Sequence, residues 1–212
     1  SVMSTLGAIT LNLSFILYCF FYLPQLWHNL QKNHIKNLSF SFHALLTMSA
    51  CADLYYAFGR IEQWQYRVVS LIMLSCVLIQ HLQWYAYVEN RQKPSLKFLT
   101  LSFFIVASIA GLSISTSKFQ FGSLIFLLAG WIERLGYLLY ALPQIIKNRY
   151  TASANSINIK FVLLALCLGI LDWISALIYH WGSASIIGTP ISILLHLWLL
   201  KQCTFQRFDT NT

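Results

Sequence analysis

Long apolar runs separated by short polar segments dominate the sequence. A helix that crosses a membrane needs about 20 mostly apolar residues, and the runs have this length. They predict seven transmembrane helices, at residues 5–27, 39–59, 67–88, 97–116, 122–147, 157–180 and 183–202. Residues 124–128 are all apolar, whereas the strands of a membrane β-barrel alternate between apolar and polar residues. The predicted fold class is therefore an all-α integral membrane protein in a lipid bilayer.

Composition agrees with this class and excludes others. Only 9% of the residues are charged, against about 25% in soluble domains. The net charge of +8 does not indicate nucleic-acid binding, because the basic residues lie in short clusters between the apolar runs. The five cysteines have no C-x-x-C spacing, and neither a phosphate loop nor a nucleophile–base motif is present. We therefore expect no enzymatic activity, no cofactor or metal, and no nucleic-acid partner.

The basic clusters orient the predicted spans. The connections 28–38, 89–96 and 148–156, with their flanking residues and the C-terminal tail, carry ten Lys and Arg residues, against three on the opposite side. The positive-inside rule then places the C-terminus in the cytoplasm and the N-terminus outside the cell or in a lumen. The membrane is a bacterial inner membrane or an organelle membrane.

The sequence repeats itself at one fixed shift, that from Pro24 to Pro143. The identical pairs at this shift are Tyr18 and Tyr137, Leu23 and Leu142, Pro24 and Pro143, Gln25 and Gln144, Asn29 and Asn148, Phe42 and Phe161, Asp53 and Asp172, and Ala57 and Ala176. Because intramembrane Pro-Gln and Asp are rare and recur here in one register without a gap, we infer a duplication.

The duplication explains the odd number of spans. A unit of three spans starts on one side of the membrane and ends on the other, so a second copy in the same orientation needs one extra crossing. Residues 97–116 supply it as a linker helix. The result is a 3+1+3 arrangement of two parallel repeats, at 5–88 and 122–202, followed by a cytoplasmic tail at 203–212. One class of transporters is built in this way.

The repeated segments also suggest a family. Residues 22–25 (YLPQ) and 141–144 (ALPQ) are each followed by an asparagine, a basic polar loop and a helix with an aspartate. This pattern resembles the PQ-loop family, which includes cystinosin, lysosomal cationic amino-acid exporters and, more distantly, the SWEET sugar transporters. The resemblance implies a transporter whose Pro-Gln motifs act as hinges for alternating access. The loops at 34–37 and 151–154 depart from the eukaryotic pattern, and we expect a bacterial member.

The two Pro-Gln motifs should interrupt their helices. Proline removes a backbone hydrogen bond and clashes with the carbonyl group four residues earlier, so Pro24 and Pro143 each create a kink. Gln25 and Gln144 place an amide that donates and accepts beside this weak point. One interpretation is a fixed kink for packing. Because two equivalent kinks across a pseudo-two-fold axis can move as a pair, we favour hinges.

Two aspartates lie within the predicted spans. Asp53 and Asp172 fall in the outer halves of the second and sixth spans, where a charge costs about 2.5–3.5 kcal/mol on insertion scales. Such a group normally faces the bundle interior and marks an ion or substrate path. A low dielectric also favours the protonated carboxyl group. We therefore predict that Asp53 and Asp172 carry protons or bind substrate, with a purely structural hydrogen-bonding role as the alternative.

Glu133 and Arg134 lie near the middle of the fifth span. Adjacent helical residues do not face each other, so we expect them to contact different partners. Arg134 could neutralise Asp53 or Asp172 or bind a substrate carboxylate, and Glu133 could bind an ammonium group or carry a proton. The first repeat has Ser14 in place of Glu133, so the second repeat is expected to dominate binding. A structural ion pair is the alternative.

Four further residues complete the predicted site: Asn148 follows the second motif, Tyr56 and Trp173 are aromatic groups that could line a cavity, and His81 titrates near neutral pH. A lone histidine in a helix is more often a packing residue than a ligand. These four therefore rest on weaker signals than the motifs and the intramembrane acids.

Together these features predict proton-coupled transport of a small polar solute, with a cationic or zwitterionic amino acid favoured because sugar sites need no acids. The expected partners are the solute, protons and the bilayer, and a homo-oligomer is compatible with the sequence. A cargo receptor or scaffold of related fold and a sugar or vitamin facilitator are the alternatives. A retinal-type light sensor would need a lysine in the middle of the last span, whereas Lys201 lies at its end.

Overall fold

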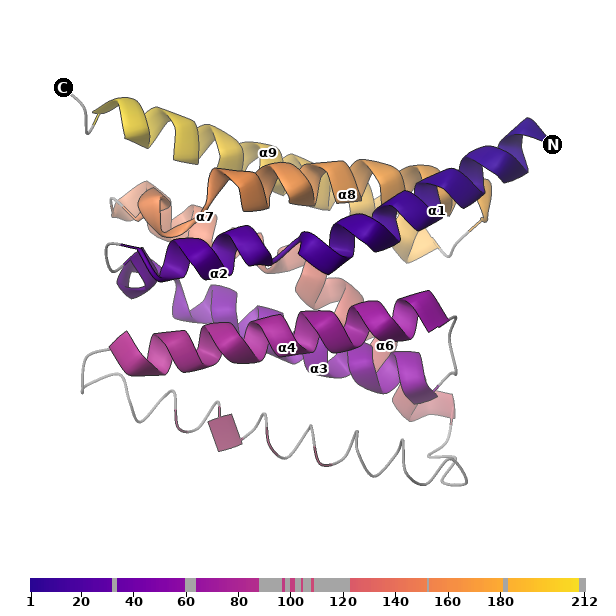
Figure 1. Ribbon diagram of the computed structural model, residues 1–212, viewed down its shortest axis with the longest axis horizontal. Helices are drawn as coiled ribbons and strands as arrows, with labels where there is room; N and C mark the ends of the chain where they lie inside the picture. Colours follow the sequence, from indigo (N-terminus) through magenta and orange to yellow (C-terminus); the bar gives the residue numbers. More distant parts are fainter. Residues whose placement is uncertain are drawn as a thin grey trace. The chain divides into compact units, whose positions relative to one another are not determined.

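The computed structural model describes residues 1–31, 34–59, 64–87, 97, 100, 101, 104, 108, 123–151, 153–180 and 183–209. Their secondary structure is helical throughout, which confirms the all-α class (Figure 1). The α-helices are α1 (Val2–Phe20), α2 (Leu23–Asn29), α3 (Phe40–Gly59), α4 (Trp64–Tyr87), α6 (Ser123–Leu139), α7 (Ala141–Tyr150), α8 (Ile159–Ile178) and α9 (Ser183–Asp209), with short 3-10 helices η1 (His34–Asn37) and η3 (Ala154–Ser156).

Most predicted spans match these helices closely, α3, α4 and α8 among them. Four segments of the described chain are long and apolar enough to cross a membrane, namely Val2–Asn29, Trp64–Tyr87, Ile159–Ile178 and Ser185–Phe205. Helix α9 continues beyond the predicted end of the last span into the segment predicted as a tail. The linker helix predicted at 97–116 lies almost entirely outside the described residues, so the total of seven spans stays a prediction.

Both Pro-Gln motifs follow an interruption of the helix, as predicted. Helix α1 ends at Phe20, four residues before Pro24, and α2 begins at Leu23. Helix α6 ends at Leu139, four residues before Pro143, and α7 begins two residues later. Each break therefore falls at the carbonyl group that the proline ring displaces.

The chain forms two compact units. The terminal unit comprises residues 1–42 and 138–212, with α1, α2, α7, α8 and α9. The central unit comprises residues 43–137, with α4 and most of α3 and α6. Each unit thus combines the first helix of one repeat with the second and third helices of the other, so the compact units do not coincide with the sequence repeats.

In the terminal unit, α1 packs against α8 through small and polar residues (Figure 1). The Thr10 and Ser175 hydroxyl groups lie 2.8 Å apart, and a methyl group on Gly7 would meet the Tyr179 ring at 2.8 Å. Large apolar side chains instead point outward from these helices, including Ile16, which is 52% exposed. Small polar contacts inside and apolar groups outside are typical of helices packed in a bilayer.

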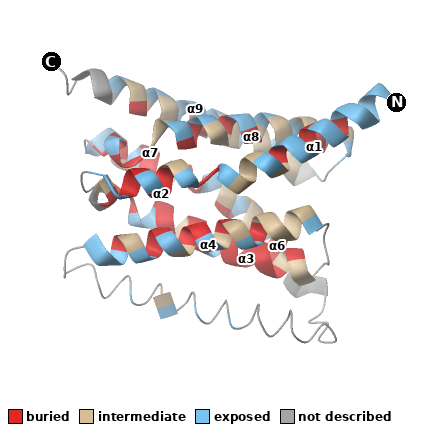
Figure 2. Ribbon diagram, in the orientation of Figure 1, coloured by how far each residue is buried: buried red, intermediate tan, exposed pale blue. Residues whose placement is uncertain are grey.

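In the central unit, α3 is mostly buried (Figure 2). Two glycines of α6 allow its close approach to α3. A methyl group on Gly136 would collide with the Ser49 side chain, and one on Gly130 would lie 2.9 Å from the Tyr56 ring. Small residues that bring two backbones together are typical of membrane helix pairs.

Candidate functional site

Gln25, in α2, joins the first repeat to the second. Its Nε2 donates hydrogen bonds to Asn29 Oδ1 at 2.9 Å and to the Ser156 carbonyl oxygen at 2.8 Å. Its Oε1 accepts from the backbone N–H of Asn158, the N-cap residue of α8, at 2.9 Å. The side chain is fully buried, so all three contacts are shielded from solvent.

Gln144, in α7, makes the corresponding contact from the second repeat to the first. Its Oε1 accepts from the backbone N–H of Ser39 at 2.7 Å, directly before α3, and its Nε2 donates to Asn148 Oδ1 at 2.8 Å. Asn148 in turn donates to Gln202 Oε1 at 3.1 Å. The predicted site residue Asn148 therefore belongs to the network of the second motif.

The two contacts are equivalent under the duplication. Ser39 and Asn158 are separated by the same shift as Gln25 and Gln144. The glutamine of each motif thus binds the backbone that starts the second helix of the other repeat. We call the contacts Gln25–Asn158 and Gln144–Ser39 the two glutamine latches, and both belong to the terminal unit.

Aromatic side chains fill both helix interruptions in an equivalent way. Phe21 stacks on Phe161 with ring centroids 4.7 Å apart, and Tyr140 meets Phe42 edge-on at 5.4 Å. Each pair joins a residue at one helix break to the second helix of the other repeat. The polar latch and its aromatic neighbour therefore form one structural element that is present twice.

Asp172 is bound by α1. Its Oδ1 accepts from the Ser14 hydroxyl group at 2.7 Å and its Oδ2 from the Tyr18 hydroxyl group at 2.6 Å. Ser14 and Tyr18 are four residues apart, which places both donors on one face of the helix. The carboxyl group lies in the terminal unit and is half-buried.

Asp53 has the same two kinds of donor, but they come from a different helix. Tyr66 donates to its Oδ1, and Ser70 donates to its Oδ2 at 2.9 Å. These residues lie one turn apart on α4, the third helix of the first repeat, whereas the donors to Asp172 lie on a first helix. Each carboxyl group therefore accepts from one serine and one tyrosine, but the donors lie on α1 for Asp172 and on α4 for Asp53.

Two other predicted residues interact with Tyr66, which donates to Asp53. Glu133, on α6, interacts electrostatically with the Tyr66 phenol, and the Tyr56 ring meets the Tyr66 ring edge-on at 6.4 Å. The sequence assigned Glu133 to a site of the second repeat. The structure places it beside residues of the first repeat, because the central unit combines α6 with α3 and α4.

Arg134 and Trp173 lie on α6 and α8. Arg134 is half-buried on α6, and among the described residues the Tyr66 and Ser70 hydroxyl groups donate to Asp53, so the roles expected of Arg134 stay predictions. The Trp173 indole N–H donates to the Ile186 carbonyl oxygen at 3.1 Å, which joins α8 to α9.

His81 lies in a buried chain of hydrogen bonds in the central unit. Gln80 Nε2 is 3.1 Å from His43 Nδ1, His43 Nε2 is 3.0 Å from His81 Nδ1, and His81 Nε2 is 2.5 Å from the Thr100 hydroxyl oxygen. The Gln80 amide nitrogen can only donate, so His43 carries its proton on Nε2 and His81 on its own Nε2. Each histidine thus accepts at Nδ1 and donates at Nε2, and the chain has one direction.

The family model of the PQ loop repeat matches the chain twice, over residues 6–66 and 125–185. The chain belongs to the PQ-loop repeat family. No curated protein matches it. The two matched segments begin and end at the same shift as the two prolines, which confirms the duplication and its register. The PQ-loop family is known for membrane transporters, and together with the apolar helices the match identifies a multi-pass membrane protein.

The histidine chain is not a common property of the two PQ-loop repeats. At the shift of the repeat, His43, Gln80 and His81 correspond to Val162, Leu199 and Leu200. Val162 and Leu199 are fully buried. Apolar residues therefore fill these positions in one PQ-loop repeat, so the fold does not require polar groups there.

This comparison gives a stability prediction. His43→Val should destabilise the protein by about 1–3 kcal/mol, because Gln80 and His81 lose a buried partner. The triple variant His43→Val, Gln80→Leu, His81→Leu should recover most of this loss, because it replaces all three polar groups by the residues of the other PQ-loop repeat. Thermal unfolding in detergent measures both variants. A triple variant less stable than the single one would contradict the argument.

Several site residues were missed by the sequence analysis. The Ser14 and Tyr18 donors and the Tyr66 and Ser70 donors had a readable signal, since each pair has a spacing of four on an apolar helix. His43 had none, because an isolated histidine in a span resembles a packing residue. Its role follows only from its contact with His81 in the fold.

Proposed function

We propose that this PQ-loop protein is a transporter that moves a small polar solute, a cationic or zwitterionic amino acid, by proton-coupled alternating access. The observation that carries the proposal is the pair of glutamine latches, in which the residue after each helix interruption is bound to the start of a helix of the other repeat.

The latches support a hinge mechanism. At each motif the helix backbone is interrupted, and the hydrogen bonds of Gln25 and Gln144 tie α2 and α7 to the segments before α8 and α3. Hinge motions use a few residues at the ends of such elements. Because the two latches are equivalent, loosening one or the other gives two related arrangements, which is what alternating access in a duplicated transporter requires.

The distribution of titratable groups supports proton coupling. Asp53 accepts a hydrogen bond from Tyr66, Glu133 interacts electrostatically with the same phenol, and a low dielectric favours the protonated form of a carboxyl group. One of them can therefore hold a proton that it exchanges during transport. The directional chain through His43 and His81 lies in the same unit and provides a continuous path of hydrogen bonds.

Asp172 supports the choice of an amine-bearing solute. It lies in the terminal unit with both latches, and its carboxylate is bound by two neutral hydroxyl groups rather than by a cation among the described residues. A carboxylate without a fixed counter-ion can attract a substrate ammonium group. Transporter folds of this type bind their solute near the bilayer midplane between the repeats.

A proton-flux assay tests the proposal. The protein is reconstituted in liposomes that contain a pH-sensitive dye, and the amino acids are added singly, with a sugar and a vitamin panel in parallel. We expect acidification with a subset of amino acids, none in empty liposomes, and its loss in Asp172→Asn. Absence of any amino-acid response, with Asp172→Asn unchanged from the parent, would refute the proposal, and uptake of a sugar or vitamin without proton flux would favour a facilitator.

A further inference from the structure

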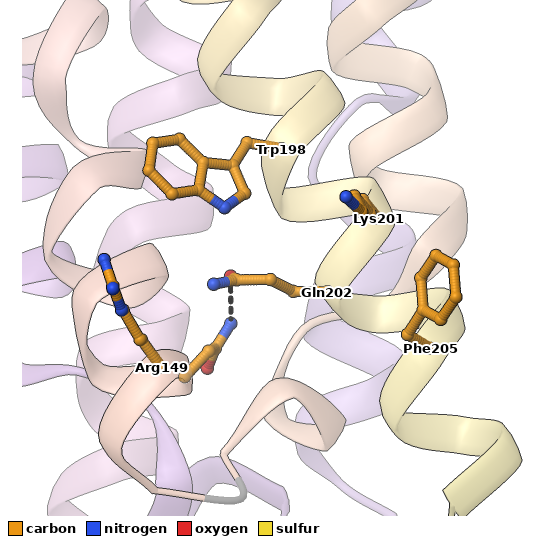
Figure 3. Close-up of a pocket in the computed structure, with 6 residues that line it drawn as sticks. Arg149, Trp198, Lys201, Gln202 and Phe205 are labelled. Atoms are coloured by element: carbon orange, nitrogen blue, oxygen red, sulfur yellow. Dashed lines mark hydrogen bonds between the residues drawn. The ribbon is translucent and has the colours of Figure 1, made fainter.

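A hollow of about 290 Å³ lies between α7 and the C-terminal part of α9 (Figure 3). Its six lining residues are Asn148, Arg149, Trp198, Lys201, Gln202 and Phe205. The four residues from α9 are spaced by three and four positions, so they share one face of the helix. In the close-up, the Trp198 and Gln202 side chains extend from α9 toward Arg149 on α7 (Figure 3).

The chemistry of this hollow suits an anion. Arg149 and Lys201 supply two positive charges, and none of the six lining residues is acidic. The guanidinium group of Arg149 can bind two oxygens of a phosphate group at once, and the Lys201 ammonium adds a second charge-assisted contact. The remaining polar surface consists of the Asn148 and Gln202 amides.

The polar wall of the hollow is fixed before any ligand binds. Asn148 donates to Gln202 Oε1 at 3.1 Å, and Gln202 Nε2 donates to the Ile145 carbonyl oxygen at 3.0 Å. Asn148 also accepts from Gln144, the residue of the second latch. The wall is therefore one end of a hydrogen-bond chain that continues to the latch, and an occupant of the hollow meets a pre-organised surface.

The position of the hollow favours a lipid as the source of the anion. Its α9 residues occupy the last two turns of the apolar segment Ser185–Phe205, where a helix of this length reaches the membrane surface. The aromatic residues Trp198 and Phe205 are 49% and 63% exposed, and such residues are enriched at that level. A lipid acyl chain can lie along them while its headgroup meets the two cations.

We propose that this hollow binds the phosphate headgroup of an acidic phospholipid, with Arg149 and Lys201 as its ligands and Trp198 and Phe205 beside the acyl chain. Basic pockets between membrane helices bind such headgroups. The proposal is independent of what the protein transports.

Native mass spectrometry of the full-length protein in detergent tests it, with phosphatidylglycerol as the acidic probe and phosphatidylcholine as the neutral one. We expect tighter binding of phosphatidylglycerol and a loss of about fivefold for each cation removed, so about 25-fold in Arg149→Gln with Lys201→Gln. The matched control is Lys160→Gln, an exposed basic residue at the start of α8 that does not line the hollow and should bind like the parent.

Equal binding of the two lipids, or unchanged phosphatidylglycerol binding in the double variant, would overturn the proposal. Displacement of the lipid by millimolar inorganic phosphate would overturn the lipid assignment, since the site would then serve a soluble anion. If the double variant does not elute as a folded protein, Lys201→Gln alone decides, because its exposed side chain can be changed without loss of packing, and the expected loss is about fivefold.

Discussion

Replacing Gln25 by leucine is expected to lower the stability by about 2–4 kcal/mol and to reduce transport by about tenfold. Leucine fills the buried space but leaves the Asn158 N–H and the Ser156 carbonyl group without their partners, and each unsatisfied buried group costs about 1–3 kcal/mol. Transport should fall because the start of α8 is no longer tied to the helix interruption. Thermal unfolding in detergent and amino-acid-driven flux in liposomes measure the two effects.

The control for this variant is Gln31→Leu, which changes an exposed glutamine a few residues beyond the same motif and should alter neither quantity. Gln144→Leu should resemble Gln25→Leu, because it removes the equivalent contact to Ser39. A Gln25→Leu protein with parental stability and flux would show that the latch does not hold the interruption. An effect in Gln25→Leu without one in Gln144→Leu would show that the two latches do not act as a pair.

Much of the architecture could be read from the sequence because it depends on local chemistry. Runs of about 20 apolar residues predict membrane helices, and proline predicts where a helix must break. The breaks at Phe20 and Leu139 follow directly from Pro24 and Pro143. The duplication was visible because rare residues recur in one register, and the two family matches have the same shift.

The partners of the buried polar groups could not be predicted, because they depend on which helices pack together. The sequence presents α6 as part of the second repeat, but in the structure it belongs to the unit of α3 and α4. Glu133 therefore lies near Tyr66, and the hydroxyl groups that bind Asp53 come from α4. The sequence of one repeat does not show that, in the fold, its helices pack with helices of the other repeat.

Because helices are exchanged between the repeats, the glutamine latches and the Asp53 region lie in different units. The latches are equivalent and lie in the terminal unit, where both motifs bind the start of a helix of the opposite repeat. Among the titratable groups without a titratable counterpart, Glu133, His43 and His81 lie in the central unit, and His196 lies in the terminal unit. In the proposed transporter, the latches of the terminal unit serve the motion, and the carboxyl groups of the central unit, Asp53 and Glu133, serve the proton.

The Asp53→Asn variant tests whether a carboxyl group of the central unit carries the proton. Asparagine keeps the size of the side chain and one oxygen that can accept from Tyr66 or Ser70, but its amide group cannot take up a proton. We expect proton-driven amino-acid uptake to fall by about tenfold, a coupling loss equivalent to about 1.4 kcal/mol, while exchange of labelled for unlabelled amino acid across the liposome membrane continues. Uptake under a proton gradient and exchange without one are measured on the same preparation.

Two variants serve as controls because both leave the Asp53 carboxyl group in place. Ser70→Ala removes one of its donors and should retain coupled uptake. Asp172→Asn, in the other unit, should lose exchange together with uptake, since we assign that carboxylate to the solute. Coupled uptake that persists in Asp53→Asn would exclude Asp53 as the proton carrier, and loss of exchange in that variant would place it in solute binding instead.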